Sequence, residues 1–224
     1  MNTKAMAAEF IGTFALVFVG VGAIAVNAMT GGSGGLVAIA LAHGLTLAVM
    51  ITAVGAISGG HLNPAVTAGA WIAGKINSTN AAGYVLAQCA GALAAAALIK
   101  CALPAAALAE VGMGTPAINT AAGVTVGMAL VTEIVLTFFL MFVVYGAAID
   151  RRAFGLGGLF IGLTVTLDIL VGGPISGAAM NPARHLGPAL LGGGTQHLWL
   201  YWVGPLLGSM GAALFYRHFL EERA

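Results

Sequence analysis

Six long apolar segments dominate the sequence and limit the folds that are open to it. They cover residues 5–27, 36–57, 81–103, 123–149, 156–172 and 198–219, each close to the roughly 20 residues with which a helix crosses a bilayer. Inside a bilayer the backbone must satisfy its own hydrogen bonds, so runs of this length predict helices. Charged residues make up only 7% of the 224 residues, whereas a soluble domain has about a quarter. We therefore predict an all-α membrane protein with six transmembrane helices.

The first apolar segment has two possible interpretations. Lys4 precedes the apolar run, as in a signal peptide, but the run continues past Ala25 with only Glu9 as a charged interruption. This is long enough to span a bilayer. We expect it to be the first membrane helix, retained in the protein.

Several functional classes are disfavoured by what the sequence lacks. The net charge is +1 and no Lys/Arg-rich run occurs, which argues against a nucleic-acid partner. The sequence has no Gly-x-Ser-x-Gly elbow, no His-Glu-x-x-His pair and no phosphate loop, so we do not expect an enzyme. The two cysteines, Cys89 and Cys101, lie 12 residues apart in one apolar run, too far apart for a disulfide. We expect no metal and no cofactor.

A short motif, Asn-Pro-Ala, occurs twice in closely similar surroundings. Residues 58–67 contain Asn63-Pro64-Ala65, and residues 176–185 contain Asn181-Pro182-Ala183. Asparagine is a good N-cap and proline suits the first helical turn, so each motif predicts the start of a helix. The apolar stretches that follow, 63–72 and 181–191, are about ten residues long and too short to cross a bilayer. They predict two re-entrant half-helices.

The two halves of the sequence repeat each other. Glu9 lies in an apolar segment whose counterpart contains Glu133, and Tyr84 in the third segment corresponds to Tyr201 in the sixth. Each half has three spans, so the second half must enter the membrane from the opposite side. We expect one membrane channel domain, residues 1–224, built from inverted repeats at about 5–110 and 120–220. The two Asn-Pro-Ala motifs then approach the bilayer midplane from opposite faces.

Small residues recur every four positions along the third and sixth segments. The stripes consist of Gly83, Ala87, Gly91 and Ala95, and of Gly204, Gly208 and Ala212. Such stripes allow close helix packing in lipid, although a chain with 34 glycines could produce one by chance. Matched positions in both halves favour the packing interpretation.

Charge placement orients the predicted helices in the membrane. With the N-terminus in the cytoplasm, the cytoplasmic side holds Lys4, Lys75, Arg151, Arg152, Arg217 and Arg223. Lys100 then lies outside and Arg184 lies within the second re-entrant stretch. Positive charges gather on the cytoplasmic side of membrane proteins, so we expect both termini there.

Two half-helices that meet at the midplane would define a pore. Their N-termini carry the positive ends of the helix dipoles, which repel cations. The stretches before them cannot be helical, so their carbonyl groups must face water rather than lipid. We expect the asparagine amides and a line of carbonyls to border the pore, from Gly59, Gly60, His61, Leu62, Gly177, Ala179 and Met180. Small neutral molecules that form hydrogen bonds suit such a path.

With these motifs the chain resembles the aquaporins, the major intrinsic protein family. Two Asn-Pro-Ala motifs in a six-span inverted repeat, with Arg184 directly after the second, carry the resemblance over nearly the whole chain. It implies a passive water channel that excludes protons and ions. It also implies that Asn63 and Asn181 donate to a central water, that Glu9 and Glu133 brace the re-entrant loops, and that the protein is a homotetramer.

The resemblance also implies a selectivity filter with four corners. These fall on His43, Ile169, Ala178 and Arg184, a set similar to that of the plant tonoplast intrinsic proteins. Several of those proteins pass ammonia, urea or hydrogen peroxide besides water. Because Ile169 stands where strict water channels usually have histidine, we expect a less polar constriction that also admits ammonia.

Other interpretations remain open at this stage. The protein could be a glycerol or urea facilitator, or a proton-coupled transporter with Glu9, Glu133, Asp168 and His43 as its relay. We expect Asp168 to form a structural hydrogen bond, to loop backbone or to His43, rather than to gate the pore. The membrane could be a prokaryotic plasma membrane, which we favour, or a vacuolar one. We expect His61 to line the cytoplasmic vestibule and His185 to brace a loop.

Overall fold

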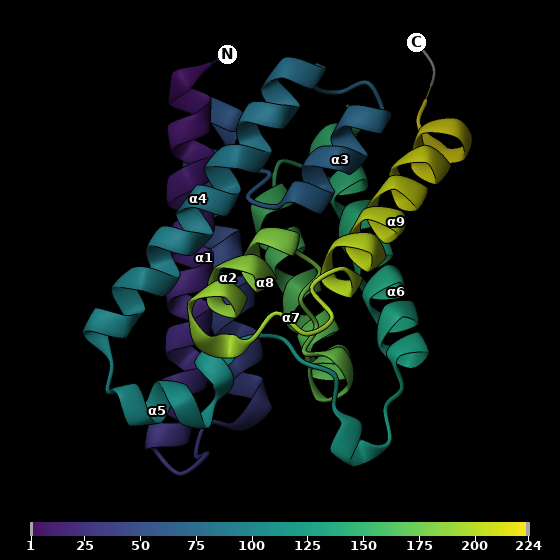
Figure 1. Ribbon diagram of the computed structural model, residues 1–224. Coiled ribbons are helices and arrows are strands. Elements are labelled where there is room, and N and C mark those ends of the chain that lie inside the picture. The colour runs from purple at the N-terminus through teal and green to yellow at the C-terminus, as the bar shows by residue number, and fades with distance from the viewer. Residues whose placement is uncertain (1, 223–224) are drawn as a thin grey trace.

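Six long helices run side by side through the structure, and two short helices lie between them (Figure 1). The computed structural model describes residues 2–222. The long helices are α1 (Thr3–Met29), α2 (Gly35–Ser58), α4 (Ser78–Ala102), α6 (Val126–Val144), α7 (Gly157–Ser176) and α9 (Leu200–Phe215). The short ones are α3 (Pro64–Ile72) and α8 (Pro182–Pro188), each beginning at an Asn-Pro-Ala motif. The predicted all-α architecture is confirmed.

Five of the long helices are apolar and long enough to cross a membrane, with α6 counted together with the turn that extends it to Ile149. The sixth, α9, has 16 residues and continues through a π-helical turn at Tyr216–Leu220. A similar π-helical turn, Tyr145–Ile149, extends α6. The two halves therefore each contribute three spans and one half-helix.

Helix α7 is longer than predicted. The glycines and proline at 172–174 suggested an end near Gly172, but the helix continues to Ser176 and ends at Gly177 in the left-handed conformation. Pro174 cannot donate a backbone hydrogen bond. The end is held instead by Asn119, whose amide Nδ2 donates to the Pro174 carbonyl and whose backbone N–H donates to the Ile175 carbonyl.

The connection between the two halves contains helical turns that we did not predict. Helix α5 (Ala105–Glu110) and the 3₁₀ turns Gly112–Gly114 and Thr120–Ala122 lie between α4 and α6. Each is too short to show a helical repeat in the sequence. Ala107 and Leu108 of α5 are buried, so packing stabilises this turn.

The small-residue stripes lie at close helix crossings. A Cβ atom at Gly91 would meet the Phe10 carbonyl oxygen on α1 at less than 3.0 Å, and one at Gly208 would meet the Ile134 carbonyl oxygen on α6 in the same way. Helices α2 and α7 cross as closely. A Cβ at Gly44 would meet the Gly162 carbonyl oxygen, and a Cβ at Gly162 would meet the Gly44 carbonyl oxygen. Glycine is required at these points because the backbones touch.

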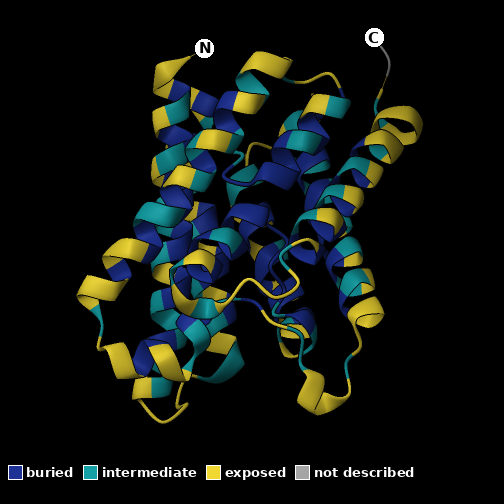
Figure 2. Ribbon diagram, in the orientation of Figure 1, coloured by how far each residue is buried: buried dark blue, intermediate teal, exposed yellow. Residues whose placement is uncertain are grey.

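The outer surface of the bundle is largely apolar, and the buried residues face inward (Figure 2). Exposed large apolar side chains follow α2 and α7 in particular, with Val37, Val49, Leu167 and Val171 each more than half exposed. A soluble protein rarely leaves a patch of this size uncovered. Of the two cysteines, Cys89 is half-buried and Cys101 is exposed, so only Cys89 contributes to packing within the chain.

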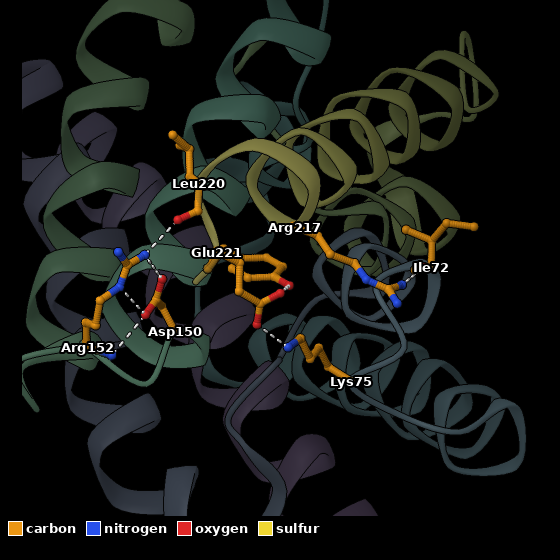
Figure 3. Close-up of polar contacts among 8 residues, drawn as sticks. Ile72, Lys75, Asp150, Arg152, Arg217, Leu220 and Glu221 are labelled. Atoms are coloured by element: carbon orange, nitrogen blue, oxygen red, sulfur yellow. Dashed lines mark hydrogen bonds and ion pairs between the residues drawn. The ribbon is translucent and has the colours of Figure 1, made fainter. Parts of the chain in front are cut away.

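Both termini lie at the same end of the bundle (Figure 1), which we call the charged end. There Lys75 Nζ lies 2.5 Å from Glu221 Oε1, and the Arg152 guanidinium pairs with Asp150 (Figure 3). Arg217 donates to the Ile72 carbonyl at the same end. Arg223, which we expected on this side, lies outside the described residues.

Candidate pore and selectivity filter

The two half-helices meet in the middle of the bundle through their asparagines. Asn63 Oδ1 accepts from the Ala65 N–H and thereby caps α3, and Asn181 Oδ1 caps α8 through the N–H groups of Ala183 and Arg184. Each Nδ2 then donates to the opposite loop: Asn63 to the Met180 carbonyl at 2.8 Å and Asn181 to the Leu62 carbonyl at 2.9 Å. These reciprocal contacts fix both amide orientations.

The two buried glutamates brace the loops that lead into the half-helices. Glu9 accepts from the Ser58 hydroxyl and from the backbone N–H groups of His61 and Leu62. Glu133 accepts from Ser176, Ala179 and Met180 in the same way. Sequence reasoning did not anticipate the two serines, although they occupy matched positions before the glycines. It also missed Gln88, which donates to Glu9 and to Thr67.

The braced loops hold left-handed backbone conformations at matched positions. The pairs Gly59/Gly177, Gly60/Ala178 and Leu62/Met180 all have positive φ, from 45° to 89°. Such conformations are unfavourable for residues other than glycine and persist only where the surroundings enforce them. The carboxylate bonds supply that enforcement here.

Two fixed sequence offsets relate the halves. Glu9 and Glu133 are 124 residues apart, and the same offset relates Leu16 to Leu140. Asn63 and Asn181 are 118 residues apart, and this offset extends back through the second span of each half. We call residues related in this way mates.

A narrow cavity of about 30 Å³ runs past the two asparagines. It is lined by one stripe on α2 and its mates on α7: His43, Leu47 and Ile51, with Ile161, Val165 and Ile169. Leu16 and Leu140 add another mated pair. Apart from His43, the lining residues of α2 and α7 are apolar, so a permeating molecule has few polar partners along these two helices.

The residues expected to supply pore carbonyls lie in different places. His61, Ala179 and Met180 line this cavity, and Gly177 lines a second cavity described below. Gly59, Gly60 and Leu62 are not among the lining residues of either cavity. The carbonyls of Leu62 and Met180 accept from the asparagines, so they hold the motif amides together rather than stand free. The difference arises because these contacts join residues more than 110 positions apart.

A second cavity, of about 300 Å³, is lined in part by residues of the 111–117 loop. We call it the outer vestibule. Four residues line both cavities: His43, Ile169, Ala178 and Arg184. They are the four expected filter residues. The structure brings all of them together at the boundary between the inner cavity and the outer vestibule.

Two of these four residues are hydrogen-bonded to each other. His43 Nδ1 lies 2.8 Å from the Ile39 carbonyl oxygen, which can only accept, so Nδ1 carries the proton. Arg184 Nε donates to His43 Nε2 at 3.2 Å, which requires Nε2 to be unprotonated. The imidazole is therefore neutral and both its nitrogens are occupied, while Ile169 and Ala178 present an apolar side.

The expected hydrogen bond of Asp168 is not formed within residues 2–222. Its carboxylate forms no hydrogen bond to His43 or to loop backbone among the described residues, and its buried Oδ2 atom has no partner there. His43 already has two other partners. Asp168 is 6% exposed and does not line either cavity, because Ile169 takes the pore-facing position beside it.

The two motif histidines have different surroundings. His61 lines the inner cavity, and its Nδ1 lies 3.1 Å from the Thr67 hydroxyl oxygen. His185 is buried and stacks on the Tyr201 ring with centroids 4.0 Å apart. Its imidazole also lies close to the backbone of Pro116 in the 111–117 loop. The role of His185 as a loop brace stays a prediction.

The fold and the cavity define a membrane channel in which two half-helices meet inside a bundle of spanning helices. Residues 1–216 match the family model described as "Major intrinsic protein". The chain belongs to this family, the aquaporins. It is an integral membrane protein and a passive water channel.

The relatives support this assignment over nearly the full chain. Aquaporin TIP4-4 of Zea mays is 47% identical over 220 residues, covering 95% of this chain and 85% of that protein. Probable aquaporin TIP3-2 of Arabidopsis thaliana is 43% identical over 232 residues, covering 98% and 84%. The solved structure of the aquaglyceroporin from Plasmodium falciparum has a TM-score of 0.86 at 25% identity, covering 98% and 97%.

Proposed function

We propose that the water channel also passes ammonia, and that His43, Ile169, Ala178 and Arg184 form its selectivity filter. The observation that carries this proposal is that these four residues alone line both the inner cavity and the outer vestibule. Whatever passes from one cavity to the other must cross them. Asn63 and Asn181 then act as the central donors, each with one N–H committed to the opposite loop and one left for the pore.

The filter chemistry favours small neutral molecules. Arg184 supplies a fixed positive charge that repels cations, together with the half-helix N-termini. His43 is occupied by Ile39 and Arg184 and cannot donate from Nε2. A water molecule that enters the constriction loses hydrogen bonds to other waters, and Ile169 and Ala178 cannot replace them. This reduces the preference of the constriction for water over ammonia.

A proton-coupled transporter is less well supported. Glu9 and Glu133 accept hydrogen bonds from backbone N–H groups of the loops, which suits a structural role. Asp168 and His43 are not hydrogen-bonded to each other. A relay through these four side chains therefore has no continuous path of hydrogen bonds in the structure.

A glycerol or urea facilitator is the second candidate, because a solved structure of similar fold is an aquaglyceroporin. The names of the curated relatives favour water instead. These relatives are plant proteins, which supports a vacuolar membrane more than a prokaryotic plasma membrane. We also propose a homotetramer with the charged end in the cytoplasm, to be checked by native mass spectrometry for four times the 22.3 kDa chain.

Stopped-flow light scattering on proteoliposomes tests the proposal. The wild-type protein should show fast water flux, ammonia uptake above that of empty vesicles, and little glycerol entry. Arg184→Val, which introduces the residue found at the mate position Val66, should increase glycerol entry because it removes a large side chain and a charge from the constriction.

Each flux measurement distinguishes the proposal from one alternative. Water flux with only background ammonia uptake would remove ammonia from the proposal. Fast glycerol entry in the wild-type protein would make it a general small-solute facilitator. Flux that follows a pH gradient would indicate the transporter.

A further inference from the structure

The imidazole of His43 lies directly against the backbone of Gly20 on α1. A Cβ atom at Gly20 would lie 2.7 Å from His43 Cδ2 and 2.9 Å from Cε1, and would also meet Nε2. Real Cβ atoms almost never come within 3.0 Å of another heavy atom. The ring therefore occupies the space that any side chain at position 20 would need.

The mates of these residues show that this space is specific to one end of the pore. The offset of 124 residues relates Gly20 to Val144, and the offset of 118 relates His43 to Ile161. At that other end Val144 and Ile161 both line the inner cavity. A valine and an isoleucine thus stand where the filter end has a glycine and a histidine.

The same offset relates Arg184 to Val66, another lining residue of the inner cavity. The three positions differ together: two valines and an isoleucine at one end correspond to glycine, histidine and arginine at the other. The large ring of His43 is accommodated at the filter end because position 20 has no side chain.

The position of the ring matters because it is bonded on both sides. Nδ1 donates to the Ile39 carbonyl on its own helix, and Nε2 accepts from Arg184. The ring lies between α1 and the cavity boundary, so a methyl group at position 20 would displace it away from α1. That movement leads toward the constriction and away from the geometry that holds Arg184.

We propose that Gly20 is a specificity-determining residue of the channel: by lacking a side chain it seats the His43 ring against α1, which sets the width of the constriction and the position of Arg184. The inference rests on the proposed filter. Gly20 acts through His43 and does not line either cavity, so it is a positioning residue.

Gly20→Ala in proteoliposomes tests this inference, with Gly22→Ala as the matched control. Gly22 lies on the same helix, and a Cβ there would meet only Ile99 Cδ1 at an ordinary 3.7 Å. Gly20→Ala should lower water permeability about tenfold, since a methyl-sized change in a tight site typically has an effect of this order or more. Gly22→Ala should match the wild type.

A double variant distinguishes an effect of Gly20 on the His43 ring from a general loss of folding. In His43→Ala the ring is gone, so adding Gly20→Ala should change neither water flux nor glycerol exclusion further. If Gly20→Ala alone fails to fold, the double variant still tests the inference. Removal of the ring leaves room for the methyl group and should restore folding.

Two results would overturn the inference. One is wild-type water flux in Gly20→Ala; the other is a loss caused by Gly20→Ala that persists in the His43→Ala background. Failure of the filter itself is recognised differently: His43→Ala and Arg184→Val, measured alone, would then leave glycerol exclusion unchanged.

Discussion

At the scale of single residues, Glu9 concentrates the most hydrogen bonds in the first re-entrant loop. Its two oxygens accept from Ser58, from the backbone of His61 and Leu62, and from Gln88. All of these partners are donors, so the site suits a carboxylate and not an amide. Its mate Glu133 has the same arrangement with three donors.

We predict that Glu9→Gln destabilises the protein. The new NH₂ group would face N–H donors and leave at least one of them unpaired, at a cost of about 1–3 kcal/mol. The apparent melting temperature in detergent should fall on the order of 5 °C. Glu110→Gln on α5, where the side chain is exposed, serves as the control and should melt like the wild type. An unchanged melting temperature in Glu9→Gln would show that the loop is held without this carboxylate.

At the scale of elements, the crossing of α2 and α7 determines how the pore walls are placed. Gly44 and Gly162 meet backbone to backbone, and each would place a Cβ against the carbonyl oxygen of the other. His43 lies next to Gly44 on α2, and Ile169 lies on α7. The distance between these two helices therefore controls the separation of two filter residues.

Gly162→Ala should destabilise the protein and Gly55→Ala should not. A side chain at 162 separates the helices, and overpacking of this kind costs about 1–3 kcal/mol. A Cβ at Gly55, on the same pair of helices, would meet nothing within 4 Å. Alanine there should stabilise α2 by up to about 1 kcal/mol because it is the better helix former. Thermal unfolding of the two variants checks the opposite signs, and equal shifts would contradict the role of the crossing.

At the scale of the whole molecule, the charged end joins three segments that are distant in sequence. Lys75 follows α3, Asp150 and Arg152 connect α6 to α7, and Glu221 belongs to the C-terminal segment (Figure 3). Arg152 bonds to Asp150 and to the Leu220 carbonyl, and Glu221 accepts from Lys75 and from the Tyr145 hydroxyl. These contacts hold the C-terminal segment against both halves.

We predict that the C-terminal segment is released by acid and not by mild changes of pH. Hydrogen bonds from Arg152 lower the pKa of Asp150, and the bonds from Lys75 and Tyr145 lower the pKa of Glu221. A carboxylate with a lowered pKa stabilises the folded form above its unfolded pKa, about 4, and this contribution is lost as the pH falls through the folded pKa. The contacts should therefore persist between pH 7 and 5 and open below about 4.

The mobility of a spin label at the exposed Phe219 measures this release. Glu221→Gln should increase the mobility already at pH 7, whereas Glu222→Gln, at the exposed neighbouring position, should not. A change in mobility between pH 7 and 5 would contradict the prediction, because the pKa of each of the two carboxyl groups is lowered from its ordinary value.

Much of the fold was predictable because its signals are local. Apolar length alone predicts the spans, and the Asn-Pro pairs predict the starts of α3 and α8 through capping. The end of α7 was not predictable in this way, because its last turn is held by Asn119, 55 residues earlier. The helical turns between α4 and α6 were missed since they are too short to carry a repeat.

The sequence by itself determined the class of the protein and the symmetry of its two halves. Span length and helix caps depend on neighbouring residues, and the matched glutamates can be found by comparing the two halves of the sequence. The tertiary structure alone decided which groups hydrogen-bond to each other around the pore. The asparagines donate to two loop carbonyls, the expected hydrogen bond of Asp168 is not formed in the described part of the chain, and Arg184 donates to His43 across 141 positions. Such contacts depend on how closely helices pack, and that distance is set by pairs of residues far apart in the chain, as at Gly20.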